Sequence, residues 1–152
     1  RASGRIVRQF VDHSVRGIIT PRRAAGRQIE RRHRTLVAYK QHAIGHDREM
    51  ALVVEHKDPN TGEYAILGVG RLSKVHQSAE AEFAILVSDA WQGHGFGAEL
   101  LRRLVQIGRD EKLQRIVATI LADNVAMQHV SRKIGFKLKR VESEYQAELD
   151  LT

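Results

Sequence analysis

The sequence predicts a single α+β domain, and three observations support this fold class. The 152 residues match the size of one domain, and a hydrophobic fraction of 42% supplies enough apolar material for a core. Short strand-like runs alternate with amphipathic helical stretches. No repeat, low-complexity segment or Pro/Gly-rich linker divides residues 1–152. Because the sequence begins at Arg1 rather than Met, we expect a processed chain or a piece of a longer one.

The N-terminal third is expected to contain a strand followed by a helix. Residues 5–11 fit a first strand. Thr20 and Pro21 fit a helix start, with Thr20 as the N-cap and Pro21 at the first helical position, where a backbone N–H is not needed. The helical pattern continues to about Ala43, with one break near Gly26.

The middle of the chain predicts a hairpin and one further strand. Residues 49–56 have the apolar character of a buried strand, and residues 63–73 fit the returning strand. Between them, residues 58–62 have the composition of a turn. Residues 79–88 predict a further strand with an acidic start and an apolar end.

Helices and strands alternate in the rest of the chain. A helix is expected directly after Gly97, because an apolar stripe at helical spacing follows, formed by Leu100, Leu101, Leu104, Val105 and Gly108. The remaining expected elements are a strand over 115–121, a short helix over 124–134 that ends at Gly135, and strands over 136–141 and 144–149. The order is a hairpin meander, then strand, helix, strand, helix, strand and strand.

The positive charge of the chain is concentrated at its N-terminal end. Residues 1–48 carry 12 Lys and Arg against 3 acidic residues, whereas residues 49–152 carry 13 against 15, which together give the formal net charge of +7. A basic segment favours an anionic partner. The candidate partners are nucleic acid, a phosphorylated ligand and an acidic protein surface. The arginines have no interleaved aromatic residues that would stack on bases, so a solvated face is the preferred interpretation.

Several classes of protein are excluded or disfavoured. The absence of cysteine excludes disulfides, thiolate zinc sites and a covalent cysteine mechanism, and it fits a cytoplasmic protein. No metal site is predicted, since His42 and His46 have zinc-ligand spacing but lack a glutamate between them. No apolar run approaches the ~18 residues of a membrane helix, so we expect no membrane association.

A glycine-rich loop is the most informative segment. The strand over 79–88 runs into Gly93, Gly95 and Gly97, and a helix opens directly after them. Free N–H groups at a helix start, together with the helix dipole, favour a phosphate there. The loop is not a P-loop, because no Gly-Lys-Ser/Thr follows, and its spacing is not that of a dinucleotide fingerprint. A purely structural tight turn remains the alternative interpretation of these glycines.

Two motifs together resemble the GNAT superfamily of N-acetyltransferases. Gln92-x-x-Gly95-x-Gly97 resembles the acyl-CoA pyrophosphate loop of that superfamily, and Asn124 opens a helix that ends in Gly135-Phe136, as its second motif does. The resemblance covers roughly residues 49–141. Residues 47–53 and 81–87 are most similar to bacterial Pat-type protein lysine acetyltransferases, in which the domain is often fused to a larger regulatory region.

The resemblance implies a GNAT-like fold and a binding mode for acetyl-CoA as the cosubstrate. The fold would be a mixed, mostly antiparallel sheet that is flanked by helices and splays open at the acyl-CoA site, next to residues 83–87. The pantetheine arm would pair with backbone near Leu86 and Val87, and Asn124 would reach it from the far side of the gap. The residues implied to contact acyl-CoA are Leu86, Val87, Gln92, Gly93, His94, Gly95, Phe96, Gly97, Ala98 and Asn124.

Glu82 is the predicted general base. A lysine acceptor has a pKa of ~10.4, so an enzyme that acetylates it at neutral pH needs a group to take its proton. Glu82 matches the position of the superfamily's base, and Ala81, Phe83 and Ala84 are expected to give it apolar surroundings. Glu80 is the alternative, on the same face of the strand if no bulge intervenes. Many members carry a general-acid Tyr seven residues after the Asn, where this chain has Ser131, so we expect Ser131 to pack rather than catalyse.

The sequence therefore predicts an acetyl-CoA-dependent N-acetyltransferase. The expected acceptor is a protein lysine ε-amine, with direct transfer in a ternary complex because no cysteine is present to carry an acyl group. The alternatives are a small-molecule amine or a protein N-terminus as acceptor. A non-catalytic acyl-CoA sensor and a nucleic-acid-binding module are the alternatives from other functional classes.

Overall fold

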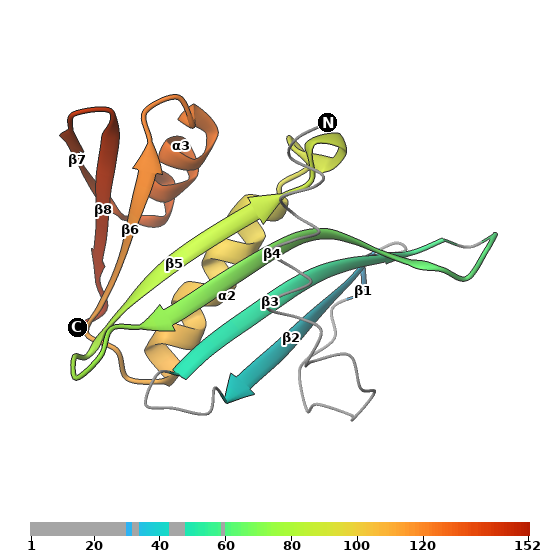
Figure 1. Ribbon diagram of the computed structural model, residues 1–152, viewed down its shortest axis with the longest axis horizontal. Coiled ribbons are helices and arrows are strands. Elements are labelled where there is room, and N and C mark those ends of the chain that lie inside the picture. Colours follow the sequence, from blue (N-terminus) through green and yellow to red (C-terminus); the bar gives the residue numbers. More distant parts are fainter. Residues whose placement is uncertain (1–29, 32–33, 43–47, 59) are drawn as a thin grey trace.

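The computed structural model describes residues 30–31, 34–42, 48–58 and 60–152. Within these residues the chain forms one mixed sheet and two α-helices (Figure 1). In chain order, the elements are β1 (Glu30–Arg31), β2 (Arg34–His42), β3 (Arg48–Lys57), β4 (Tyr64–Lys74), β5 (Glu80–Val87), the short 3-10 turn η1 (Asp89–Trp91), α2 (Phe96–Asp110), β6 (Arg115–Leu121), α3 (Val125–Ile134), β7 (Lys137–Val141) and β8 (Glu144–Asp150).

The N-terminal half of the sheet contains the one clear error of the sequence prediction. The helix expected to continue to Ala43 is wrong over Glu30–Arg31, which forms β1, and over Arg34–His42, which forms β2. Strand β2 pairs antiparallel with β3 from Arg34↔His56 to His42↔Arg48. Thr35, Val37 and Tyr39 alternate along β2 and are of the β-branched and aromatic types that strands favour. A long ladder with β3 therefore outweighs the weak local helix preference. The strand expected over 5–11, the helix start at Thr20 and the break near Gly26 lie outside the described residues.

The hairpin formed by β3 and β4 is confirmed. Asp58 closes its turn, because its carboxylate accepts hydrogen bonds from the backbone N–H groups of Asn60 at 2.7 Å and Thr61 at 3.3 Å. The pairing continues from β4 to β5 without a shift in register, from Lys74↔Ala81 to Gly68↔Val87. Side chains therefore alternate regularly along β5, so Ala81 and Phe83 share one face and Glu80 and Glu82 share the other.

Helix α2 forms the core with one face of the sheet. It lies behind β4 and β5 in the view of Figure 1, and its residues Leu100, Leu101 and Leu104 are completely buried. Phe83 of β5 packs edge to face against Phe136, with ring centroids 5.3 Å apart, which joins the two halves of the domain. The predicted helix, its apolar stripe and the later strands are all confirmed, with boundaries that differ by only one or two residues.

The sheet opens between β5 and β6. These two strands run parallel and pair only at Glu80↔Arg115, Ala81↔Ile116 and Glu82↔Val117. Beyond Val117, β6 pairs with β8 alone among the described strands, and β7 pairs with the far side of β8. Figure 1 shows β6, β8, β7 and α3 diverging from β5 as a separate leaf. The expected mixed, mostly antiparallel and splayed sheet is confirmed, and the gap runs alongside residues 83–87.

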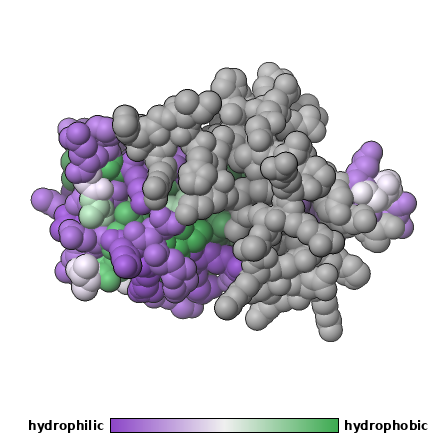
Figure 2. All heavy atoms as spheres, turned by 90° about the horizontal axis from the view of Figure 1, so that it is seen from below, coloured by the Kyte–Doolittle hydropathy of each residue, from purple (hydrophilic) through white to green (hydrophobic). Residues whose placement is uncertain are grey.

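The described surface is mostly hydrophilic in the view of Figure 2, with smaller hydrophobic areas between the polar ones. Large hydrophobic side chains that are exposed include Leu121 and Val125 at the β6–α3 corner and Val141 at the end of β7. No helix in the described part of the chain is long and apolar enough to cross a membrane.

Candidate acyl-CoA site at the open edge of the sheet

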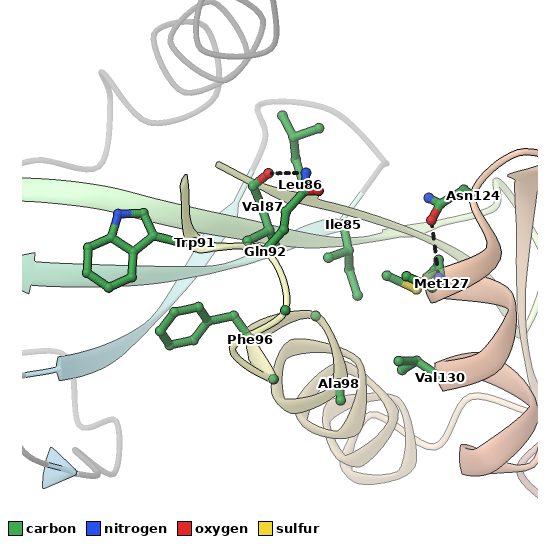
Figure 3. Close-up of a pocket in the computed structure, with 14 residues that line it drawn as sticks. Ile85, Leu86, Val87, Trp91, Gln92, Phe96, Ala98, Asn124, Met127 and Val130 are labelled. Atoms are coloured by element: carbon green, nitrogen blue, oxygen red, sulfur yellow. Dashed lines mark hydrogen bonds between the residues drawn. The ribbon is translucent and has the colours of Figure 1, made fainter. Parts of the chain in front are cut away.

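A cavity of about 280 Å³ lies where the sheet splays open. Its walls come from the end of β5, the glycine-rich loop, the start of α2 and the first turns of α3 (Figure 3). Of the residues predicted to contact acyl-CoA, all but His94 line it. The complete lining is Ile85, Leu86, Val87, Trp91, Gln92, Gly93, Gly95, Phe96, Gly97, Ala98, Asn124, Ala126, Met127 and Val130.

The loop after β5 is fixed by Gln92 and by two glycines. The Gln92 amide nitrogen donates to the Val87 carbonyl oxygen at 3.2 Å, which ties the loop to the end of the strand (Figure 3). The same nitrogen donates to the Asp89 carboxylate at 3.2 Å. Gly93 and Gly95 have φ angles of 75° and 83°, in the left-handed region that glycine tolerates best. A Cβ atom at either position would meet nothing within 4 Å. Backbone conformation, rather than crowding within the chain, therefore requires glycine here.

The start of α2 is an anion-binding arrangement by its geometry. Gly95 is the N-cap, and the first helical hydrogen bond runs from the Glu99 N–H to the Gly95 carbonyl oxygen at 3.1 Å. The N–H groups of Phe96, Gly97 and Ala98 come before the first helical hydrogen bond, so they have no acceptor within the helix and point out of its N-terminal end. The nearby Glu99 carboxylate is offset by Arg103 at 2.8 Å and Arg102 at 3.7 Å.

The His94 side chain braces the loop. Its Nδ1 atom lies 2.9 Å from the Gln92 carbonyl oxygen and 3.1 Å from the Trp91 carbonyl oxygen. Because both partners are acceptors, Nδ1 carries the proton and donates to them. The ring also stacks on Phe96 at a centroid distance of 6.4 Å and lies 5.6 Å from the Trp91 ring. His94 is outside the cavity lining, and its backbone contact with a phosphate stays a prediction.

Asn124 faces this loop from the opposite wall. It is the N-cap of α3, and its side-chain oxygen accepts a hydrogen bond from the Met127 N–H at 3.1 Å (Figure 3). The side-chain NH₂ group is therefore the donor that Asn124 offers to a ligand. Ala126, Met127 and Val130 complete this wall. The sequence analysis missed them as lining residues, although their helical spacing after Asn124 places them on one face.

Glu82 lies at the closed end of the gap. It occupies the last rung that β5 shares with β6, opposite Ser73 on one side and Val117 on the other. Its side chain is exposed, on the face of the sheet away from α2. The expected apolar surroundings are only partly present, because Ala81 and Phe83 are buried on the opposite face. The reason is the regular alternation of side chains along an unbulged strand.

Glu80, the alternative base, is on the same face as expected but has an ionic partner. Its carboxylate lies 3.5 Å from the Arg115 guanidinium, which also donates to Asp150 at 3.0 Å. The Asp150 hydrogen bond and the charges of Asp150, Glu80 and Glu148 raise the pKa of Arg115. Glu80 thus belongs to a surface ion-pair group where β5 and β6 are still paired, two residues before the gap opens. Glu82 is therefore the better placed of the two carboxylates for the predicted role of general base.

Ser131 is completely buried in α3, and its hydroxyl oxygen has no hydrogen-bond partner among the described residues. It does not line the cavity. Its position agrees with a packing role, as expected from the sequence.

The comparison with known proteins identifies the family of this fold and loop. The family described as "Acetyltransferase (GNAT) domain" matches residues 5–137. The chain therefore belongs to the GNAT acetyltransferase family, and the predicted resemblance is confirmed.

Two relatives agree with the expected similarity to Pat-type acetyltransferases, and a third structure shows the same fold. The acetyltransferase Pat of Mycolicibacterium smegmatis is 35% identical over 60 residues, which cover 40% of this chain and 18% of that protein. The GNAT domain of S. lividans PAT superposes with a TM-score of 0.57 at 27% identity, over 68% of this chain and 61% of that one. The yncA structure of Salmonella typhimurium, which contains its cofactor acetyl-CoA, has a TM-score of 0.57 at 23% identity, over 68% and 65% of the two chains. The chain spans about half the length or less of the curated relatives that it matches.

Proposed function

We propose that this chain is an acetyl-CoA-dependent N-acetyltransferase whose acceptor is a protein lysine ε-amine. The observation that carries the proposal is the position of an anion-binding helix start and a carboxylate at opposite ends of one gap. Phe96, Gly97 and Ala98 at the start of α2 line the cavity at the open end of the gap, and Glu82 occupies the last pair that β5 shares with β6 at the closed end. The lysine acceptor rests on the similarity to Pat-type acetyltransferases.

Acetyl-CoA would lie along the free edge of β5. Beyond Glu82, the edge of β5 that faces the gap has no strand partner among the described residues, so its backbone groups are open to hydrogen bonding. The amide-containing pantetheine arm suits such an edge, near Leu86 and Val87. The pyrophosphate would then reach the glycine loop, and the Asn124 NH₂ group would contact the arm from the opposite wall.

Acetyl transfer in this arrangement is a single displacement. The neutral amine nitrogen attacks the thioester carbonyl carbon, the new C–N bond forms, and the C–S bond breaks to release the CoA thiolate. Reaching the neutral amine from a lysine at pH 7 costs about 4–5 kcal/mol. Glu82 would accept the proton directly or through water. A thiol pKa near ~8.5 makes the thiolate a tolerable leaving group without a strong acid, which agrees with a serine at position 131.

The test is intact-mass measurement of candidate acceptor proteins after incubation with the chain and acetyl-CoA. The expected result is the gain of one or more acetyl groups on lysine side chains, located by peptide mapping. Acceptor proteins with chemically blocked lysines and a free N-terminus separate lysine transfer from N-terminal transfer. Acetylation of only the N-terminus would refute the proposed acceptor. CoA binding without any transfer would support an acyl-CoA sensor instead.

A further inference from the structure

The corner between β6 and α3 carries one wall of the gap. After Val117, β6 is paired only with β8 among the described strands, as far as Leu121↔Glu144. The chain then turns through Ala122 and Asp123 into α3. Asn124, Met127 and Val130 of α3 line the cavity, and β6 is joined to β5 only as far as Glu82↔Val117, so this corner contributes to the position of that wall relative to β5.

A buried amide side chain fastens the corner. Gln128 lies one turn into α3 and is only 5% exposed. Its side-chain nitrogen donates to the Leu121 carbonyl oxygen at 3.1 Å and to the Ala122 carbonyl oxygen at 2.9 Å. Both hydrogens of one NH₂ group are thus used on two consecutive carbonyls, which joins the first turns of α3 to the end of β6.

The corner is anchored further by backbone hydrogen bonds. The Ala122 N–H donates to the Ser143 carbonyl oxygen at 2.9 Å, in the turn between β7 and β8. The Asn124 N–H donates to the Leu121 carbonyl oxygen at 3.0 Å, so that oxygen serves both the cap residue and Gln128. Gln128 itself does not line the cavity, and any effect on a ligand must pass through its neighbours.

A glutamine such as Gln128 is an unusual residue at a buried helix position. A buried helix position is normally filled by an apolar side chain, which packs without leaving polar groups to satisfy. A buried amide gives less burial energy, but its hydrogen bonds have fixed directions and select one arrangement of the groups that they join. In this corner, the two hydrogen bonds of Gln128 fix the position of α3 relative to the end of β6.

We infer that Gln128 is a positioning residue that sets the spacing between α3 and β5 and thereby the affinity for acyl-CoA. The inference rests on the proposed placement of acetyl-CoA in the gap. Gln128 holds Asn124, Met127 and Val130 at the distance that the ligand requires, and it touches neither the ligand nor the acceptor.

The test compares Gln128→Leu with the wild type and with Gly108→Ala. Leucine keeps the approximate size and burial of the side chain but removes both hydrogen bonds. The dissociation constant of CoA, measured by calorimetry, and the KM for acetyl-CoA should each rise roughly tenfold, which corresponds to about 1.4 kcal/mol of binding free energy. The kcat at saturating acetyl-CoA should stay within about twofold, because Glu82 and the loop are unchanged.

Gly108→Ala controls for a general loss of stability. It lies near the far end of α2, where an added Cβ would stand 2.8 Å from the Ile116 Cδ1 atom. This variant should lower the Tm and keep the CoA affinity of the wild type. Gln128→Met, a second variant without donors, serves if the leucine variant does not fold.

Wild-type affinity in a folded Gln128→Leu or Gln128→Met variant would overturn the inference and leave the proposed function intact. Failure of the wild type itself to bind CoA would overturn the proposed function, and the inference with it.

Discussion

The two walls of the gap are built in different ways. The β5–α2 wall is held by continuous antiparallel pairing with β4 and by an apolar helix face on which Leu100, Leu101 and Leu104 are completely buried. The β6–α3 wall rests on a short helix whose buried residues, Gln128 and Ser131, are polar. At the cavity, the first wall includes Gly93, Gly95 and Gly97 and the backbone N–H groups at the start of α2, whereas the second wall contains no glycine and contributes side chains. Substitutions should therefore act through conformation and charge on the first wall and through lost side-chain groups on the second.

The largest effect on CoA binding is expected from Gly95→Glu, on the β5–α2 wall. At roughly 100 times its Kd, CoA should stabilise the wild type by about 2.7 kcal/mol, or about 5–10 °C in Tm for a chain of this size. A glutamate at Gly95 places a carboxylate where the phosphate would bind, and a side chain at φ 83° adds backbone strain. We expect the thermal shift with CoA to disappear.

Gly62→Glu is the matched control for this experiment. Gly62 lies in the β3–β4 turn with φ 73° and no atom within 4 Å of an added Cβ. It should suffer similar strain and keep the full CoA shift. An unchanged shift in Gly95→Glu would remove the pyrophosphate from this loop.

The next largest effect is expected at the apex, where the walls meet. Glu82→Gln should keep the CoA affinity within a few-fold and lower turnover at pH 7 by about 10²-fold, the usual scale for losing a general base. Raising the pH should partly restore turnover, because the acceptor amine then loses its proton without help. A pH–rate profile with one acceptor protein checks both statements.

Glu80→Gln is the control at the apex, because Glu80 lies on the same face but is paired with Arg115. Its turnover should remain within a few-fold of wild type. Full activity of Glu82→Gln at pH 7 would show that another group takes the proton.

A smaller effect is expected from Asn124→Ala on the side-chain wall. Removing the N-cap should lower the free energy of unfolding by about 1 kcal/mol. Losing the NH₂ donor should weaken CoA binding by about 2–10-fold, the value of one hydrogen bond. Denaturant unfolding and calorimetry measure the two effects separately.

Asn124→Ser distinguishes the two roles of this side chain. Serine can cap the helix but cannot supply the NH₂ group, so it should recover most of the stability and little of the affinity. Recovery of both would assign Asn124 to helix capping alone.

The smallest effect is expected from Ser131→Ala. Its hydroxyl is buried without a partner among the described residues, so its removal should leave the free energy of unfolding unchanged or raise it by up to about 1 kcal/mol. Turnover should fall less than ~10-fold. An inactive but folded Ser131→Ala variant would indicate that the hydroxyl supplies a proton to the leaving thiolate.

Local patterns in the sequence predicted most of the fold. The hairpin, the strand that enters the glycine loop and the helix stripe are encoded by neighbouring residues, and the structure confirms them. Local pattern also predicted an anion site at the helix start after the glycines, whereas Gln92 and Asn124 were implied by the resemblance to the GNAT superfamily. The structure brings all of these residues to one cavity, and their contact with acyl-CoA stays a prediction.

The errors and omissions involve partners that are distant in sequence. The strand at Arg34–His42 carries a local strand signal in Thr35, Val37 and Tyr39, but the ladder with β3 that stabilises it joins residues distant in sequence. The surroundings of Glu82 depend on which strands flank it, Ser73 on one side and Val117 on the other. Gln128 stands at a buried helical position, but its two carbonyl partners become visible only once the end of β6 is placed.

Strand β5 also sets the distance between the two ends of the gap. Glu82 and Val87 are five residues apart, which corresponds to about 16–17 Å along an extended strand. On the proposed placement, the Val87 end of this length lies near the phosphates of CoA, which are the same for every acyl group. The Glu82 end lies near the acyl group. Inserting one residue into β5 would lengthen the strand by about 3.3 Å and turn every later side chain to the opposite face. On this placement the length of β5 would match the distance between the phosphates and the acyl group, and acyl selectivity would depend on the residues near Glu82.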